Sequence, residues 1–258
     1  MLEILHDLFS YTFIVRALIV GTLVSLCAAL LGVSLVLKRY SMIGDGLSHV
    51  GFGALAVAMA FHWAPLPVAI PVVVVAAFLL LRLSENSKIK GDSAIALIAS
   101  SSLAIGVTVI SLASGQNADV YSYMFGSILA MKGSDVYVSI ALSVVVLILF
   151  IVFYNKIFAV TFDENFAKAT GTRANLYNML IALLTAVTIV VGMRIMGTML
   201  ISSLIIFPAL SAMRIFRQFR SVVIASAVIS IICFFIGLVA SYAFSTPTGA
   251  SIVIVNLI

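Results

Sequence analysis

Residues 13–37 read FIVRALIVGTLVSLCAALLGVSLVL, a stretch whose one charged side chain is Arg16. About 18 apolar residues are enough for a helix to cross the hydrocarbon core of a bilayer. Several further runs of this kind follow along the chain, so the first is interpreted as a membrane span rather than a cleaved signal peptide. This stretch therefore predicts an integral membrane protein.

The composition of the whole chain agrees with this prediction. Of its 258 residues, 64% are hydrophobic and only 9% are charged. A soluble domain carries about a quarter of its residues as charged side chains, so this chain is too apolar to cover a surface facing water. The net charge of +5 is explained by basic loops that orient spans in a membrane, so no nucleic-acid partner is expected.

Hydropathy predicts an all-α fold, a polytopic transmembrane bundle of about eight spans in one domain over residues 1–258. The expected spans are residues 13–37, 42–61, 66–83, 93–113, 135–154, 174–193, 197–213 and 222–244. A last apolar piece, residues 250–258, is too short to cross the bilayer as a helix. It is expected to be a half-span or a ninth span cut short.

The basic residues predict which ends of these spans face the cytoplasm. With the N-terminus outside, most of the Lys and Arg side chains fall on the inner side, as the positive-inside rule requires. The inner ones are Lys38, Arg39, Arg82, Lys88, Lys90, Lys156, Lys168, Arg173, Arg214, Arg217 and Arg220, and the outer ones are Arg16, Lys132 and Arg194.

Two connections are longer than ordinary loops. The outer one, residues 115–134, mixes aromatic and apolar residues, which fits an interfacial or re-entrant helix and an aromatic segment at the membrane surface equally well. The inner one predicts a short amphipathic helix over about residues 161–171. Thr161 or Asp163 can cap its start and Gly171 can end it, while Phe162 and Phe166 share a face. Because its first turn is acidic, a protein partner is favoured over an anionic lipid surface.

The second span contains the ionisable pair Asp45 and His49. Their spacing of four residues places them on one helix face, and ionisable groups inside a membrane usually have a function or a partner. Carboxylate and imidazole are both ligands for Zn²⁺ or Mn²⁺, and a two-fold homodimer would bring two such pairs together. A hydrogen-bonded pair that only holds helices together and a proton relay are the alternatives. Four glycines around the pair leave room for close helix neighbours, namely Gly44, Gly46, Gly51 and Gly53.

Other chemically active side chains are isolated in the sequence. His6 and His62 each lie alone on the outer side, and are expected to be surface histidines. Cys27 and Cys233 lie within apolar runs and are expected to be small buried residues. No disulfide framework or zinc-finger spacing is present.

Residues 41–49, SMIGDGLSH, resemble a motif of the membrane subunits of bacterial metal-type ABC importers, which take up zinc or manganese. The likeness extends over nearly the whole chain. It includes residues 119–131, with the pattern D-x-x-x-Y-x-F-G-x-I-L-A, residues 196–209, which contain Pro208, and residues 248–254, TGASIVI. Residues 162–171 resemble the cytoplasmic coupling helix of this family, with matching residues at Asp163, Glu164, Ala167 and Gly171.

This resemblance implies a complete transport machine. Two copies of the chain would form the metal pathway in a bacterial cytoplasmic membrane, and Asp45 and His49 of each copy would contact the passing metal. Two separate ATPase subunits would dock on the four matching coupling-helix residues, and an extracytoplasmic metal-binding protein would deliver the metal. The chain itself would be no enzyme and would hold no permanent cofactor. It has no G-x-x-x-x-G-K-[ST] loop, in agreement with ATP binding to another polypeptide.

The wording of the GDGLSH motif favours zinc, with manganese or iron as the alternative cargo. A secondary transporter driven by an ion gradient is a more distant alternative, and would normally show inverted repeats, which are not evident here. An intramembrane zinc protease would need H-E-x-x-H, which is absent from the sequence.

Overall fold

The computed structural model describes residues 12–86, 91–113 and 133–258, and every regular element within these ranges is a helix. The helices are α2 (Thr12–Leu37), α3 (Ile43–Ala60), α4 (Pro65–Asn86), α5 (Gly91–Leu112), α7 (Gly133–Val152), α8 (Tyr154–Phe162), α9 (Glu164–Ala169), α10 (Ala174–Met196), α11 (Thr198–Ile215), α12 (Phe219–Phe244) and α13 (Thr248–Leu257). The predicted outer segment at residues 119–131, and with it His6, Lys88, Lys90 and Lys132, lies outside the described residues.

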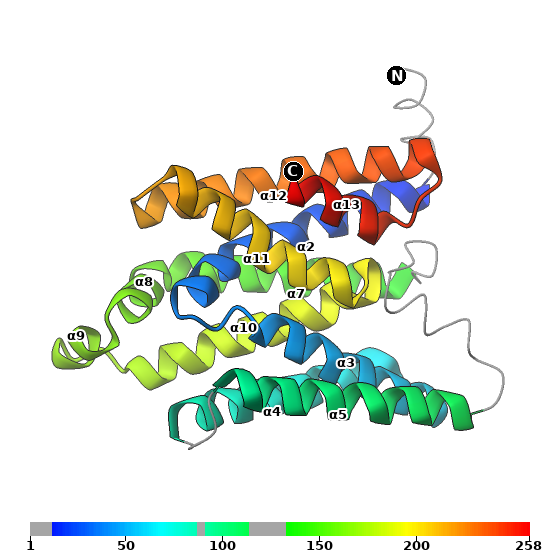
Figure 1. Ribbon diagram of the computed structural model, residues 1–258, viewed down its shortest axis with the longest axis horizontal. Helices are drawn as coiled ribbons and strands as arrows, with labels where there is room; N and C mark the ends of the chain where they lie inside the picture. Colours follow the sequence, from blue (N-terminus) through cyan, green and yellow to red (C-terminus); the bar gives the residue numbers. More distant parts are fainter. Residues whose placement is uncertain (1–11, 87–90, 114–132) are drawn as a thin grey trace.

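The long helices lie side by side in two groups that share a central helix (Figure 1). One group contains α2, α11, α12 and α13, and the other contains α3, α4 and α5. Helix α10 packs against members of both groups, and also against α7. The short helices α8 and α9 lie together at one end of the bundle, next to the end of α2 (Figure 1).

The number of spans agrees with the prediction from hydropathy. Seven of the described helices are long and apolar enough to cross a membrane, and the bent pair α7 and α8 makes an eighth. Helix α13 has 10 residues, which corresponds to about 15 Å and to half of the hydrocarbon core. It packs against α12 and α11, as expected for a half-span.

The inner segment after the fifth span differs from the prediction. The chain bends by 69° between α7 and α8, so a second helix, Tyr154–Phe162, precedes the short amphipathic one. Thr161 therefore lies within α8 and does not cap a helix, whereas Asp163 caps α9 by accepting a hydrogen bond from the Phe166 amide. Aromatic contacts hold α8 in place, because Tyr154 and Phe158 both pack against the ring of Phe219 at the start of α12. Hydropathy along the sequence cannot predict contacts between residues so far apart in the chain.

The glycines of α3 face three different helices, as the prediction of close neighbours requires. A side chain in their place would have no room: a Cβ atom on Gly53 would lie 2.8 Å from the Ser102 carbonyl oxygen of α5, and one on Gly46 would lie 2.6 Å from Ile95 of α5. Gly44 faces Ile205 of α11, and Gly51 faces Met193 of α10. These contacts make α3 the most buried of the spans and fix its rotation about its own axis.

Candidate functional site

The rotation of α3 leaves one narrow exposed stripe along its first part. From Ile43 to Ala56, every residue is buried except Asp45 and His49. The Asp45 side chain is 43% exposed and that of His49 is 22% exposed. An acid and an imidazole are among the side chains that cost most to place against lipid. Exposure of these two side chains to acyl chains would therefore be costly, and a surface that faces a partner or water is expected there.

The two side chains lie close together without forming a tight pair. His49 Nε2 is 3.7 Å from Asp45 Oδ2, which is beyond the range of a good hydrogen bond. Ser202 of α11 lies on the other side of the carboxylate, with its Oγ 3.5 Å from Asp45 Oδ1, and donates its hydrogen bond to the Thr198 carbonyl at 3.1 Å. The carboxylate therefore keeps unused acceptor capacity on the exposed side.

This geometry can hold part of a metal coordination shell. Two ligand atoms on a tetrahedral ion with bonds of about 2.1 Å lie about 3.4 Å apart, so a small side-chain rotation brings Asp45 and His49 to that separation. Within residues 12–86, 91–113 and 133–258, no three His, Cys, Asp or Glu side chains gather closely enough to hold a metal. The described part of one chain thus offers two such ligands, which is half of a tetrahedral shell.

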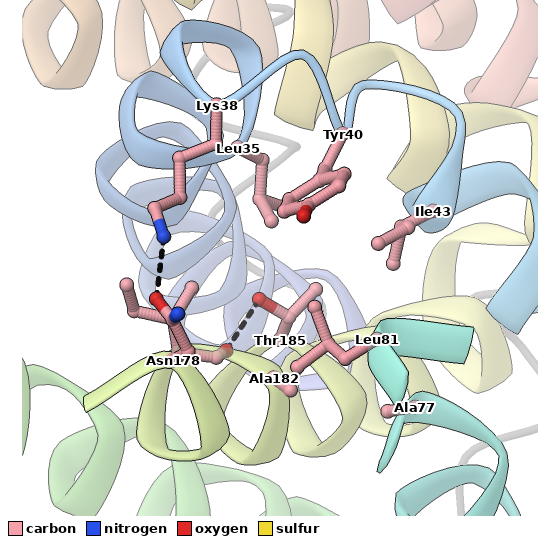
Figure 2. Close-up of a pocket in the computed structure, with 10 residues that line it drawn as sticks. Leu35, Lys38, Tyr40, Ile43, Ala77, Leu81, Asn178, Ala182 and Thr185 are labelled. Atoms are coloured by element: carbon pink, nitrogen blue, oxygen red, sulfur yellow. Dashed lines mark hydrogen bonds between the residues drawn. The ribbon is translucent and has the colours of Figure 1, made fainter. Parts of the chain in front are cut away.

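A second polar cluster lies where α2 ends, next to α9 and α10. Lys38 Nζ contacts Asn178 Oδ1 of α10 and lies 3.4 Å from Glu164 Oε2 of α9. Asn178 donates its amide to the same Glu164 oxygen at 3.0 Å, and Lys168 pairs with the other oxygen at 2.8 Å. Figure 2 shows Lys38 reaching from the end of α2 to Asn178. We call Lys38, Asn178 and Glu164 the α2–α9–α10 cluster.

The carboxylate of Glu164 is strongly stabilised in this cluster. Partial burial raises its pKa, but hydrogen bonds from Lys168 and Asn178, together with the charge of Lys38, bring the pKa down from 4.5 to about 2. Glu164 is therefore ionised throughout the physiological range. The contact also shows that the connection after α2 and the segment around α9 lie at the same end of the bundle, as the distribution of basic residues predicts.

Two aromatic side chains next to and within α9 point away from the bundle. Phe162 is 64% exposed and Phe166 is 66% exposed, whereas Ala167 is fully buried. Gly171 has φ of +80° just after the helix, which is the left-handed position that ends many helices. Of the four predicted docking residues, Glu164 and Ala167 thus face the body of the chain, Asp163 caps α9, and Gly171 follows its end. Docking of an ATPase on these residues stays a prediction.

Comparison with known proteins places these features in a family. The family model described as ABC 3 transport family matches residues 10–258. This chain belongs to the ABC 3 transport family. A manganese import system permease protein of Streptococcus gordonii is 29% identical over 98% of this chain and 91% of that protein. A manganese transport system membrane protein of Halalkalibacterium halodurans is 27% identical over 96% of this chain and 85% of that protein.

A solved structure of PsaBC from Streptococcus pneumoniae in complex with Fab has the same fold, with a TM-score of 0.88 and 29% identity. The match covers 99% of this chain and 92% of that one. The resemblance to membrane permeases of metal-type ABC importers, and the multi-pass location in the cell membrane, are thereby confirmed. The preference for zinc that the GDGLSH motif indicated gains no support, because these relatives are named for manganese.

The structure also places the isolated histidine and the two cysteines that the sequence singled out. His62 follows α3 with a left-handed φ of 55° and lies apart from Asp45 and His49 in the described structure. Cys27 is buried, as expected. The prediction for Cys233 is wrong in part, since this residue is only half-buried, on a face of α12 next to α13.

Sequence reasoning missed two residues that the structure brings to these clusters. Ser202 interrupts an apolar span, and Asn178 lies near the start of another. Polar residues within spans are a usable signal, because each must find a partner in the membrane. The sequence could have indicated their importance, but it could not assign Ser202 to Asp45 or Asn178 to Lys38, which are 157 and 140 residues away.

Proposed function

We propose that this chain is the membrane subunit of an ATP-driven importer of divalent metal, with Mn²⁺ as the favoured cargo. Metal would pass through a conduit between two copies of the chain, contacting Asp45 and His49 of each. ATP would be hydrolysed by separate subunits docked at α9. Membership of the ABC 3 transport family and the manganese-import names of relatives support this proposal.

One observation supports the proposal most strongly: between Ile43 and Ala56 of α3, Asp45 and His49 alone are not buried. A purely structural pair would be expected to be buried between helices with a short hydrogen bond. Here the carboxylate is 43% exposed, and the separation of the two side chains is 3.7 Å. A second copy facing this stripe would remove it from lipid and add another Asp and His, completing four ligands.

The cargo must also leave the site, so weak binding is an advantage. Carboxylate and imidazole ligands suit Mn²⁺ as well as Zn²⁺, and their chemistry does not exclude either metal. A site assembled from two incomplete halves loses ligands when the copies move apart. This allows a rigid-body movement driven by ATP to release the metal to the other side.

Helix α9 is the proposed docking element for the ATPase. Phe162 and Phe166 are exposed there, at the end of the bundle where the basic loops are predicted to face the cytoplasm. Aromatic side chains fit a groove on a partner protein. Asp163 and Gly171 define the start and end of this short helix, and Glu164 and Ala167 anchor it to the bundle.

The test is transport by the chain and its ATPase reconstituted in lipid vesicles. We expect radiolabelled Mn²⁺ to accumulate with ATP and not without it, and radiolabelled Zn²⁺ to accumulate less under the same conditions. Greater ATP-dependent accumulation of Zn²⁺ than of Mn²⁺ would reassign the cargo to zinc. Uptake driven by a proton gradient in the absence of ATP would contradict the proposal and favour a secondary transporter.

A further inference from the structure

The α2–α9–α10 cluster connects the proposed docking helix to the helix that carries the metal ligands. We propose that Lys38, Asn178 and Glu164 are positioning residues that transmit movement of α9 to the start of α3, and so couple ATP hydrolysis to opening of the Asp45 and His49 site. This inference rests on the proposed function and adds to it the contacts through which one chain transmits the movement.

An ion pair connects Glu164 of α9 to Lys38 at the end of α2. Glu164 contacts Lys38 of α2 and Asn178 of α10 through the same oxygen, Oε2. The Lys38 side chain is 9% exposed, Asn178 is 6% exposed and the Glu164 side chain is 32% exposed, so water reaches the cluster mainly from the side of Glu164. Charged hydrogen bonds with little exposure are among the strongest polar contacts in proteins. A shift of Glu164 must therefore shift Lys38 or break the cluster.

The chain between Lys38 and α3 is short and closed by hydrogen bonds. The amide of Tyr40 donates to the Leu35 carbonyl at 2.8 Å, and that of Arg39 donates to the Val36 carbonyl at 3.0 Å. With Arg39 at φ of 62°, these bonds form a Schellman motif at the end of α2. The Ile43 amide then bonds to the Tyr40 carbonyl at 3.0 Å, so the turn leads directly into α3.

Asp45 thus lies seven positions after Lys38, and backbone hydrogen bonds from Arg39, Tyr40 and Ile43 connect the end of α2 to the start of α3. In Figure 1 this connection turns back along the bundle, so that α3 begins further inside than α2 ends. Movement of the connection along the bundle would be delivered to the first turn of α3. That turn contains Asp45.

The connection also has space beside it. A small pocket separates Tyr40 of the connection and Ile43, the first residue of α3, from Ala77 and Leu81 of α4 and Ala182 of α10 (Figure 2). Protein interiors are normally packed without such gaps, and a tightly filled contact resists displacement. The pocket leaves a small gap between the connection and helices α4 and α10, where a limited displacement would meet little resistance.

The experiment compares variants of the reconstituted complex of this chain with its ATPase. We measure Mn²⁺ uptake and ATP hydrolysis in the same vesicles. In the Lys38→Met variant we expect hydrolysis to continue, while uptake per ATP falls about tenfold. In a Lys168→Met background, which removes the like charge beside residue 164, the double variant Lys38→Glu with Glu164→Lys restores the pair with reversed charges. We expect it to recover much of the lost uptake. The Asn178 amide can turn over to match this reversal.

Two further variants separate coupling from stability. Lys168→Met removes a partner of Glu164 that lies on α9 itself, so uptake per ATP should stay unchanged. Ala182→Val narrows the pocket and leaves every charge in place, and it should lower uptake per ATP as Lys38→Met does, with an unfolding midpoint in detergent close to that of the unmodified chain. Normal uptake per ATP in Lys38→Met, or a double variant no better than the single ones, would overturn the inference.

A readout independent of transport distinguishes this inference from the proposed function. Hydrogen exchange of residues 38–50 should change when ATP is added to the unmodified complex, and this change should be absent in Lys38→Met. If the unmodified complex carries no metal but the exchange response depends on Lys38, the function is wrong and the mechanical link stands. If metal is carried and the exchange response is the same in both, the link is wrong.

Discussion

The two polar clusters of this chain differ in how completely their members are paired. Glu164 has three partners at 2.8, 3.0 and 3.4 Å, contributed by its own helix and two others. Asp45 has a histidine at 3.7 Å and a hydroxyl at 3.5 Å, and its side chain is 43% exposed. A satisfied cluster holds helices together, whereas an unsatisfied one keeps capacity for a ligand. This difference indicates that the first transmits movement and the second contacts cargo.

The largest effect should come from the unsatisfied cluster. Replacing Asp45 or His49 by Ala should reduce Mn²⁺ uptake more than about 100-fold, because each change removes a proposed metal ligand. Thermal stability in detergent should barely change, since neither side chain has a short bond to lose. His62→Asn is the matched control, because Asn tolerates the left-handed backbone at that position. Uptake at the unmodified level in both Ala variants would remove the pair from the mechanism.

The satisfied cluster should, in contrast, show a large effect on stability. Glu164→Gln should lower the free energy of unfolding by about 2 kcal/mol at pH 7, because it removes a partly buried charge from its partners. The pKa of Glu164 is about 2 in the folded chain and 4.5 ordinarily, so its contribution is present above pH 4.5 and is lost as the pH falls toward 2. Denaturation in detergent at several pH values checks this. A stability difference that persists unchanged at pH 2 would show that the charge is not the cause.

The end of α9 should show a smaller effect. Gly171 has φ of +80° and open space within 4 Å of the position that a Cβ would occupy, so Gly171→Ala should cost about 1 kcal/mol through backbone strain alone. Gly171→Asn should cost less, because Asn adopts this conformation more readily. Equal unfolding midpoints for both variants and the unmodified chain would show that the turn does not limit stability.

The smallest effect should come from Lys168, whose side chain is 51% exposed. Its pair with Glu164 lies along one helix, and such exposed pairs contribute about 0.3–0.5 kcal/mol. Lys168→Met should therefore shift the unfolding midpoint slightly, and the shift should disappear in high salt. A loss as large as that of Glu164→Gln would show that Lys168, rather than the bonds to α2 and α10, holds the cluster together.

Much of this architecture was predictable because it depends on local composition. Apolar runs placed the spans, and the polar pair four residues apart on residues 42–61 identified the exposed stripe of α3. The bend after α7 was not predictable, because it depends on Tyr154 and Phe158 meeting Phe219, far along the chain. The α2–α9–α10 cluster escaped prediction for the same reason. Its members lie far apart in the sequence, and no local pattern indicates that they are in contact in the fold.

The most direct test of the central claim asks what the exposed stripe of α3 faces. His49→Cys can be labelled in a Cys233→Ala background, where the remaining Cys27 is only 1% exposed. We predict that a charged, water-soluble thiol reagent modifies the introduced thiol in the assembled complex. Modification by lipid-soluble reagents alone would show that the stripe faces acyl chains and would contradict the proposed metal pathway.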